Sequence, residues 1–432
     1  MISSRSRESS SSTVHLVTHS GEPPALTGTC GQRHWGGWRA QIIWRPKAVR
    51  SLTLALVAFL FGTAITGFEV EGSSAAEMVA HWSIVPSPNT GSGRYDFMEG
   101  VSCISASNCT AVGYYYQNSN VQTLIERWNG TGWSIVASPD TSTNLDNYLN
   151  DVSCTSSSGC TAVGYHFNGI ADQTLIERSK GSAWSIVPSP DMGASQSEYL
   201  SGVSCPSRDA CTAVGAFKGA AAYQVLIEQW NGTRWSIVRS HDTGTTEGNY
   251  LSGVSCVAGN TCTAVGDYFT GTAFRTLVER RLGTSWSITS SPNMGHSYDN
   301  KLTGVSCTTR SACAAVGDYD TATSKRALIE HFDKDVWSIV ASPNAGPKGA
   351  DYLNGISCTS KACIAVGAHF TGSASLTLIE RRVGSYWSII PSPNVSTKKT
   401  NSLNAVSCTS PLACTAVGYY SLVADHTLVT KS

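Results

Sequence analysis

Charged side chains are scarce in this sequence. Only 14% of its 432 residues are Asp, Glu, Lys or Arg, and 30 basic residues against 30 acidic ones leave no net charge. A chain without an excess of basic residues has no electrostatic field that attracts nucleic acid or an anionic lipid surface. We therefore expect no nucleic-acid partner, and a membrane contact only through the N-terminal segment described below.

Several catalytic and metal-binding patterns are also missing. The sequence contains no Cys-x-x-Cys pair, and no His cluster, Ser/His/Asp set or Gly-rich phosphate loop stands out. It also lacks a sustained helical period. Gly, Ser, Thr and Asn are abundant instead, which is typical of turn-rich extracellular β proteins. The sequence thus predicts an all-β protein with no cofactor and no metal.

Cysteine, by contrast, is abundant and regularly placed. Of the 15 cysteines, Cys30 stands alone. The other fourteen form close pairs: Cys103/Cys109, Cys154/Cys160, Cys205/Cys211, Cys256/Cys262, Cys307/Cys313, Cys358/Cys363 and Cys408/Cys414. Zinc needs four converging ligands, and no His recurs beside these pairs. We interpret them as seven disulfides, which implies an oxidising compartment.

The N-terminal segment has the features of a secretory signal. A mostly apolar run from Leu52 to Phe68 follows basic residues and precedes the small residues Ser74-Ala75-Ala76. Residues 51–76 are therefore predicted to be a signal peptide that is cleaved after Ala76, with an uncleaved signal anchor as the alternative. Residues 1–50 are read as a polar leader that is either disordered or the result of a start assigned too far upstream. The expected localisation is secreted or cell-surface.

Residues 77–432 contain a repeat of about 51 residues. Its clearest marker is the string Trp-Ser-Ile, which begins at Trp82, Trp133, Trp184, Trp235, Trp286, Trp337 and Trp387. Each unit has four short β-type runs bounded by Gly, Ser, Asn or Pro. We label them A (Val-Ser-Cys), B (Cys-Thr-Ala-Val-Gly), C (Thr-Leu-Ile-Glu) and D (Trp-Ser-Ile-Val). Four antiparallel strands repeated at this period are typical of a propeller blade.

In each unit the cysteine pair brackets the loop between the A and B runs. Two cysteines that face each other across an antiparallel pair have a Cα separation suited to a disulfide. We therefore expect each disulfide to act as a staple on the A–B hairpin of its own blade.

The two ends of the repeat region predict a closed ring. It opens with a lone D run at Trp82 to Val85 and finishes with A, B and C runs that have no D run after them. An open stack would leave two unpaired sheet edges, which promote aggregation. We therefore predict a seven-bladed β-propeller of four-stranded antiparallel blades, closed by the N-terminal strand, which completes the last blade.

These repeats resemble those of secreted bacterial propeller proteins, in the broad architecture of kelch and galactose-oxidase-like propellers. The kelch double glycine, the Trp-Asp of WD repeats and the Asp-box of sialidases are absent. The resemblance therefore implies the fold and does not carry a function to this chain.

Two residues recur in almost every unit. The D-run Trp favours packing between neighbouring blades, with sugar binding as the alternative. Glu ends the C run in six copies, and Thr430 stands in the seventh. Paired carboxylates are used by glycosidases, but these six are spread around the ring, so we interpret them as hydrogen-bonding groups between blades.

Ligand recognition is expected where the repeat is broken. In propellers the D–A and B–C loops open on one face around the channel mouth, and binding residues often lie in loops on a rigid scaffold. Positions just before the A run and just after Ala-Val-Gly vary among the copies and supply Tyr, His, Asn and Asp, which suit carbohydrate or peptide recognition. The candidate ligand-binding residues are Glu99, Tyr148, Asn150, His166, Asp267, Tyr268, Asp318, Tyr319, Asn354 and His369.

Three functional hypotheses follow. The first is a non-catalytic extracellular binding or scaffold protein that recognises a glycan or a cell-surface protein, and it is expected to be a monomer. The second is a carbohydrate-active enzyme, a glycoside hydrolase or lyase, at the channel mouth. The third is a purely structural envelope protein. Nearly uniform repeats favour the first over the second, because catalysis needs an asymmetric cluster of acid, base or metal ligands.

Overall fold

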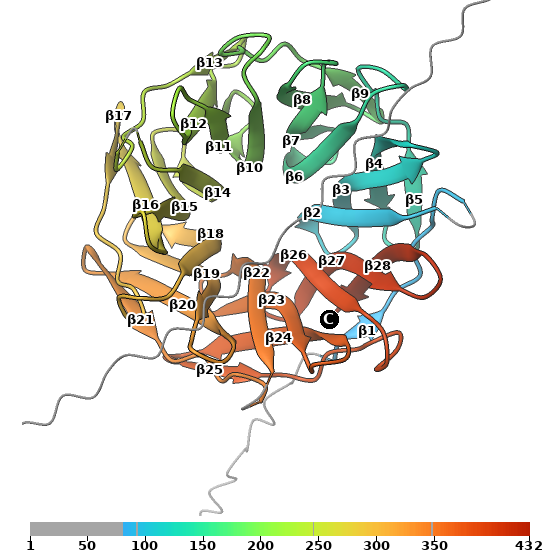
Figure 1. The fold of residues 1–432 in the computed structure, drawn as a ribbon. Coiled ribbons are helices and arrows are strands. Elements are labelled where there is room, and N and C mark those ends of the chain that lie inside the picture. The colour runs from blue at the N-terminus through green and yellow to red at the C-terminus, as the bar shows by residue number, and fades with distance from the viewer. Residues whose placement is uncertain (1–80, 92–93, 245, 347–348) are drawn as a thin grey trace, which may run out of the picture. The chain divides into compact units, whose positions relative to one another are not determined.

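The computed structural model describes residues 81–91, 94–244, 246–346 and 349–432. The predicted leader and signal segment, and Cys30, lie outside the described residues. The described chain forms seven four-stranded antiparallel sheets, which Figure 1 shows as blades arranged in a ring. In this part of the chain no helix is long and apolar enough to cross a membrane.

Each blade contains four consecutive strands, with the A strand innermost. Blade 1 consists of β2 (Asp96–Ser105), β3 (Asn108–Gln117), β4 (Asn120–Trp128) and β5 (Trp133–Val136). Blade 2 consists of β6 (Asn147–Ser156), β7 (Gly159–Phe167), β8 (Asp172–Lys180) and β9 (Ala183–Ile186). Blade 3 consists of β10 (Glu198–Ser207), β11 (Ala210–Lys218), β12 (Tyr223–Trp230) and β13 (Trp235–Ile237).

The remaining blades follow the same order. Blade 4 consists of β14 (Asn249–Ala258), β15 (Thr261–Phe269), β16 (Phe274–Leu282) and β17 (Ser285–Ile288). Blade 5 consists of β18 (Asn300–Thr309), β19 (Ala312–Asp320), β20 (Lys325–Asp333) and β21 (Val336–Val340). Blade 6 consists of β22 (Ala350–Cys358), β23 (Ala362–Phe370), β24 (Ser375–Val383) and β25 (Tyr386–Ile389). Blade 7 consists of β26 (Asn401–Ser410), β27 (Ala413–Ser421), β28 (Asp425–Lys431) and β1 (Ser83–Ile84).

The predicted closure of the ring is confirmed. In blade 7 the strand order is β1-β28-β27-β26, and Ser83 and Ile84 pair with Lys431 and Thr430. Figure 1 shows β1 beside the C-terminal strand β28. The first strand of the described chain therefore supplies the outer strand that the last three lack, so the last blade is complete.

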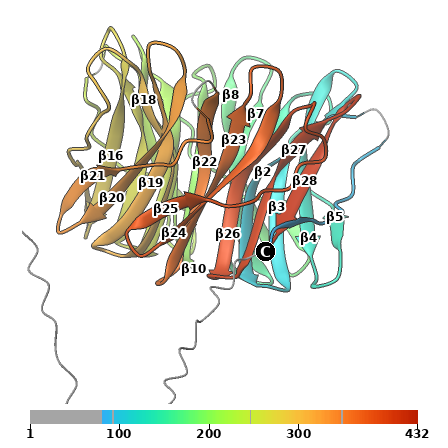
Figure 2. The same cartoon turned by 90° about the horizontal axis from the view of Figure 1, so that it is seen from below.

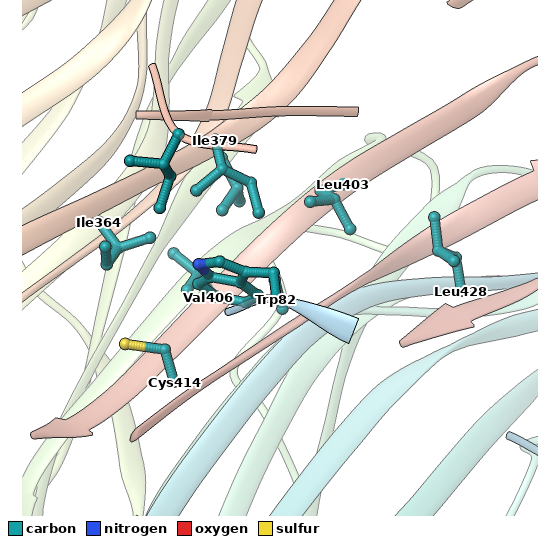
Figure 3. Packing of buried hydrophobic residues seen from close by; sticks show 10 residues of the cluster. Trp82, Ile364, Ile379, Leu403, Val406, Cys414 and Leu428 are labelled. Carbon is teal, nitrogen blue, oxygen red and sulfur yellow. The ribbon is translucent and has the colours of Figure 1, made fainter. Parts of the chain in front are cut away.

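The recurring Trp packs between blades, as predicted. Trp82 is 4% exposed and belongs to one core cluster with residues of blades 6 and 7. In Figure 3 its indole lies near Ile364 and Ile379 of blade 6 and Val406 of blade 7. The equivalent Trp184 packs with Ile125 of the preceding blade. The seven Trp side chains are thus part of the core, and their recurrence reflects packing.

The Gly of the Ala-Val-Gly motif is required by close strand pairing. In blade 3 a Cβ on Gly215 would lie 1.9 Å from the carbonyl oxygen of Tyr199 on the neighbouring A strand. The A strand has a β-bulge directly after this point, between Leu200 and Gly202. A bulge bends its strand and redirects side chains, so this motif helps to set which A-strand residues face the channel.

Each of the seven cysteine pairs forms a disulfide across the A–B hairpin of its own blade, as predicted. The two Cα atoms are 4.0 Å apart in every pair. The blade 6 pair, Cys358–Cys363, is separated by five positions and the other six pairs by six. Seven disulfides in one domain are typical of proteins from oxidising surroundings.

The disulfides also contribute to packing, which the sequence did not indicate, because one cysteine of each pair is buried in the core between blades. The first cysteine of each pair is only partly buried. The second cysteines are at most 6% exposed, and they are Cys109, Cys160, Cys211, Cys262, Cys313, Cys363 and Cys414.

This burial follows from the position of the second cysteine near the start of the B strand, which packs against the neighbouring blade. Cys160 of blade 2, for example, shares a core cluster with Ile125 of blade 1 and with Trp184. The sequence showed only that each cysteine pair brackets a surface loop, and this pattern did not indicate a contact between blades. The disulfides therefore also fill apolar space between blades, where cysteine packs as a small hydrophobic residue.

The recurring Glu joins adjacent blades, as predicted. Glu177 of blade 2 is fully buried and accepts a 3.1 Å hydrogen bond from Ser138, which follows the D strand of blade 1. The same contact joins Ser87 to Glu126, and therefore links the closing segment of blade 7 to blade 1. Burial raises the pKa of Glu177 to about 8. These carboxyl groups therefore link neighbouring blades through hydrogen bonds.

Candidate functional site

The variable positions lie on one face of the ring, which we call the loop face. There the A strands begin, the B strands end, and the D–A and B–C loops connect them. The opposite face, which we call the disulfide face, carries the A–B hairpins and the C–D turns. Figure 2 shows the strands running between these two faces.

A ring of polar residues lines the central channel. They bound a cavity of ≈ 180 Å³ and come from equivalent positions of the seven A strands: Glu99, Asn150, Ser201, Ser252, Thr303, Asn354 and Asn404. We expected these residues just before the A strand. The structure instead places them inside the strand, at the β-bulge, as for Glu99 between Met98 and Gly100. The bulge was missed because it interrupts the strand's alternation of buried and exposed residues without a marker in the sequence.

Several members of this ring bond to the next blade. Asn150 Nδ2 donates to the carbonyl oxygen of Leu200 at 2.7 Å, and Asn354 Nδ2 donates to that of Leu403 at 2.9 Å. The Asn404 amide donates to the Glu99 carboxylate at 3.0 Å. The ring therefore connects the blades as well as lining the channel.

Two carboxyl groups beside the channel have raised pKa values. Burial raises the pKa of Glu99 to about 7, although the Asn404 amide opposes the shift. Burial also raises the pKa of Asp151 to about 7, against hydrogen bonds from the backbone N–H groups of Val203 and Val152. A carboxyl group with a pKa near 7 can either donate or accept a proton at neutral pH.

Aromatic side chains form a continuous arc on the loop face. Nine partly exposed rings touch in series, with neighbouring centroids 4.6 to 6.4 Å apart. This aromatic arc runs from blade 7 through blades 1, 2 and 3 to blade 4. In order its members are Tyr419, Phe97, Tyr114, Tyr148, Tyr165, Tyr199, Tyr223, Tyr250 and Phe274.

The arc meets the polar ring in a cavity between blades 2 and 3. This cavity measures ≈ 470 Å³ and contains ring residues, arc residues and one further carboxylate: Glu99, Asn150, Tyr165, Asp172, Tyr199, Ser201 and Tyr223. Burial raises the pKa of Tyr165 to about 12, so its hydroxyl keeps its proton and can donate a hydrogen bond. The cavity therefore combines aromatic ring faces with groups that donate hydrogen bonds and groups that accept them.

Blades 4 to 6 present charge where the arc ends. The ammonium group of Lys301 lies 4.0 Å from the centroid of Phe274, the last ring of the arc. Asp318 forms a 2.8 Å ion pair with Lys325, so a lysine neutralises this predicted site carboxylate. Burial raises the pKa of Asp267 to about 6, with Lys301 opposing the shift. The loop face thus has an aromatic sector and a charged sector.

A second charged cluster involves the predicted residue His369. Its Nδ1 lies 2.7 Å from the carboxylate of Asp351, which is fully buried. Arg326 approaches the same carboxylate to 3.6 Å. The side chain of His369 is held by these contacts and is only 16% exposed. The cluster lies at the start of β22, where Asp351 is the second residue of the strand.

The structure brings some of the predicted residues together and separates others. Tyr148 lies in the arc, while Glu99 and Asn150 share the 470 Å³ cavity. The side chains of Tyr268 and Tyr319 pack against the cores between blades. The other predicted residues lie elsewhere on the loop side: His166 on β7, Asn354 in a ≈ 380 Å³ cavity between blades 6 and 7, and Asp267, Asp318 and His369 in the charged sector.

Sequence reasoning missed most of the aromatic arc. Tyr199 and Tyr250 occupy the second position of their A strands, and Tyr223 and Phe274 begin the C strands. One feature of the sequence could have indicated the arc, namely that aromatic residues recur at positions that pair across the A and B strands. In blade 2 the second A-strand residue, Tyr148, pairs directly with Tyr165, which follows Ala-Val-Gly. Residues opposite each other in an antiparallel pair lie on one face of the sheet.

Together the seven blades and their channel define a β-propeller, and the likeness to one solved structure agrees with this fold. No family model and no curated protein matches the chain. Among solved structures, YCF48 bound to a D1 peptide has a TM-score of 0.50 at 12% identity, covering 81% of this chain and 94% of that one.

Two other solved structures are also similar. Sqt1 from Chaetomium thermophilum has a TM-score of 0.47 at 11% identity, covering 76% of this chain and 82% of its own. A GH74 xyloglucanase from Xanthomonas campestris has a TM-score of 0.48 at 12% identity, covering 79% of this chain and 53% of its own. At such identities these likenesses concern the fold alone and assign no function.

Proposed function

We propose that this chain is a non-catalytic extracellular binding or scaffold protein that recognises glycan on its loop face. The observation that carries the proposal is the aromatic arc, whose nine rings open beside a polar cavity of ≈ 470 Å³. Sugar rings present apolar C–H faces that pack on aromatic rings, and their hydroxyl groups need both donors and acceptors. Tyr165, Tyr199, Asn150 and Glu99 supply these groups within one cavity.

A glycan array with the purified protein tests the proposal, followed by calorimetric titration of the glycans that bind. Tyr165→Ala and Tyr199→Ala should each weaken binding about tenfold, which corresponds to about 1.4 kcal/mol, because each removes a stacking face. Tyr298→Ala is the matched control, since Tyr298 is 40% exposed in a loop of the same face and outside the arc. Failure to bind any glycan or cell-wall fraction would instead favour a purely structural envelope role.

A carbohydrate-active enzyme is the second candidate, and one observation favours it. Glu99 and Asp172 line the same cavity, and burial raises the pKa values of both carboxyl groups, that of Glu99 to about 7. Glycosidases use two carboxyl groups, one of them protonated at neutral pH. Release of reducing sugar from a bound polysaccharide, lost in Glu99→Gln and in Asp172→Asn, would establish the enzyme in place of the binding protein.

We further propose that the chain is exported, as secreted bacterial propeller repeat proteins are. The seven disulfides support this, because such bonds form and persist in oxidising compartments. Mass spectrometry without reduction should find every pair linked within its blade in protein recovered from the native cells. Free thiols at these positions would count against export.

A further inference from the structure

A cavity of ≈ 520 Å³ lies on the disulfide face, between blades 5 and 6. It is separate from the proposed glycan site, which lies on the loop face. Blade 5 contributes Ala314, His331 and Asp333, and blade 6 contributes Lys361 and Arg382. The cavity arises at this junction because the repeat departs from its usual residues here in three places.

The first departure is His331. In blades 1, 2 and 4 the residue after the buried Glu is an Arg that reaches a carbonyl in the next blade's A–B hairpin. Arg178, for example, donates to the carbonyl oxygen of Arg208 at 2.6 Å. His331 is shorter, and its Nε2 instead accepts a 3.2 Å hydrogen bond from the indole of Trp387. The imidazole therefore leaves unfilled the space that the long Arg side chain crosses in those blades.

The second and third departures enlarge the same space. In five blades the B-strand Thr contacts the second disulfide sulfur of the next blade, as Thr263 contacts Cys313 at 3.8 Å. Ala314 stands at this position in blade 5 and lacks the Thr hydroxyl, and both Ala314 and Cys363 line the cavity. The hairpin of blade 6 is also one residue shorter than the others. The space that these missing atoms would occupy belongs to one cavity.

The positions of cation and ring at this junction are reversed relative to three other junctions. At those junctions the cation belongs to the earlier blade and the aromatic ring to the later one, as where Arg178 lies 4.3 Å from the ring centroid of Trp230 and Arg280 lies 3.9 Å from that of Phe332. Between blades 5 and 6 the ring is His331 and the cation is Arg382. Within the described part of the chain, the Arg382 guanidinium makes no cation–π contact of the kind found at those three junctions.

Arg382 also lacks the carbonyl partner of its equivalent in blade 4. There Arg281 Nη1 donates to the carbonyl oxygen of Gly259, in the middle of the hairpin, at 2.6 Å. The shortened hairpin of blade 6 does not offer that contact. Among the described residues, Arg382 donates only from Nε, to the carbonyl oxygen of Gly384 at 2.9 Å. Its two terminal nitrogens are left to bond with a ligand.

The other polar groups of the cavity favour an anion. Lys361 is exposed and forms no ion pair with a described residue. Burial and the charge of Arg382 lower the pKa of His331 to about 4, so this side chain is neutral. Because its Nε2 accepts from Trp387, its proton is on Nδ1, which is a donor. Asp333 is an exposed carboxylate at the rim, so the cavity carries a formal charge of about +1.

We propose that this junction is an anion-binding site, in which Arg382 and Lys361 hold an oxyanion group of a small polar molecule. A guanidinium with two free terminal nitrogens can bind a carboxylate, sulfate or phosphate through paired hydrogen bonds. The cavity volume of ≈ 520 Å³ is within the range of small-molecule sites and fits an acidic sugar.

Calorimetric titration with sodium sulfate, sodium phosphate and sodium D-glucuronate, at constant ionic strength, tests the proposal. The expected result is saturable binding of at least one probe at one site per chain. Glucuronate binding without sulfate or phosphate binding would identify a carboxylate ligand, and the converse a tetrahedral oxyanion. No saturable binding of any of the three probes would overturn the proposal.

Two matched variants locate the binding. Arg382→Gln should weaken the affinity about tenfold or more, because it removes a charge-assisted hydrogen bond. Arg281→Gln changes the equivalent residue of blade 4 and should change the affinity less than twofold. Equal loss of affinity in both Gln variants would contradict the site.

Discussion

Single polar side chains connect each blade to the next. The Ser of Val-Ser-Cys accepts a hydrogen bond from the backbone N–H of the Cys in the following A strand. Ser255, for example, accepts from Cys307 at 3.0 Å, and Ser407 of blade 7 accepts from Cys103 of blade 1 at 2.9 Å. This contact occurs at all seven junctions. The motif therefore repeats because each copy must bond to its neighbour.

Replacing one of these serines should destabilise the ring at one junction. Ser255→Ala leaves the N–H of Cys307 without its acceptor, and we expect a loss of about 1 kcal/mol in the free energy of unfolding. Urea unfolding followed by tryptophan fluorescence measures it. Ser134→Ala is the control, because Ser134 is exposed on its D strand. Equal unfolding midpoints for the two variants would show that the hydrogen bond does not contribute.

At the scale of the element, the closing strand is short but well anchored. β1 contains only Ser83 and Ile84, both exposed, and three backbone positions pair with β28 when Val85 is included. Such a strand contributes few hydrogen bonds. Most of its attachment comes from Trp82, which is buried among residues of blades 6 and 7. Apolar packing therefore holds the ring closed more than strand pairing does.

Trp82→Ala should open the ring. Removing a buried Trp costs about 3 to 5 kcal/mol, and the freed edge of β28 would promote association between molecules. We expect a lower thermal midpoint together with concentration-dependent aggregation, measured by calorimetry and light scattering. Ile84→Ala, in the same strand at 39% exposure, should cost less than about 1 kcal/mol. Similar behaviour of the two variants would show that closure does not depend on the indole.

At the scale of the whole molecule, six buried glutamates make stability depend on pH. Burial raises the pKa values of Glu126, Glu177, Glu228 and Glu330 to about 8 and those of Glu279 and Glu380 to about 7. The unfolded chain has the ordinary value of 4.5. Since these Glu pKa values are higher in the folded protein than in the unfolded chain, the folded protein binds more protons at pH values between 4.5 and 8. The stability from these groups is complete below pH 4.5 and is lost as the pH rises through 7 to 8.

We therefore expect the free energy of unfolding to fall between pH 6 and pH 9. The amide that replaces the carboxyl group in Glu177→Gln is neutral at every pH. This variant should therefore reduce the fall in the free energy of unfolding by on the order of 1 kcal/mol. Asp335→Asn is the control, because the Asp335 side chain is 86% exposed. Chemical unfolding at pH 6, 7.5 and 9 measures the effect. A stability that is constant or rising over this interval would mean that the buried carboxyl groups are ionised in the folded protein.

The candidate site was only partly predictable from the sequence. Glu99 and Asn150 were recognised as variable positions, and they do lie in one cavity. Tyr199 and Tyr223 of the same cavity were not recognised, because their roles depend on contacts with residues of other strands. A pattern within one unit predicts which residues share a strand face. It does not predict which side chains of adjacent blades, about 50 positions apart, touch each other.

The sequence by itself determined the number of blades, the disulfide pairs and the closure of the ring. These features depend on local patterns that every copy shares, such as the recurring Trp, and on a lone D strand at one end with three unmatched strands at the other. Only the tertiary structure decided which departures from the repeat lie together. His331 and Arg382 reverse the order of ring and cation that three other junctions share, and a cavity lies beside them. Such an outcome depends on side-chain lengths and directions across two packed sheets.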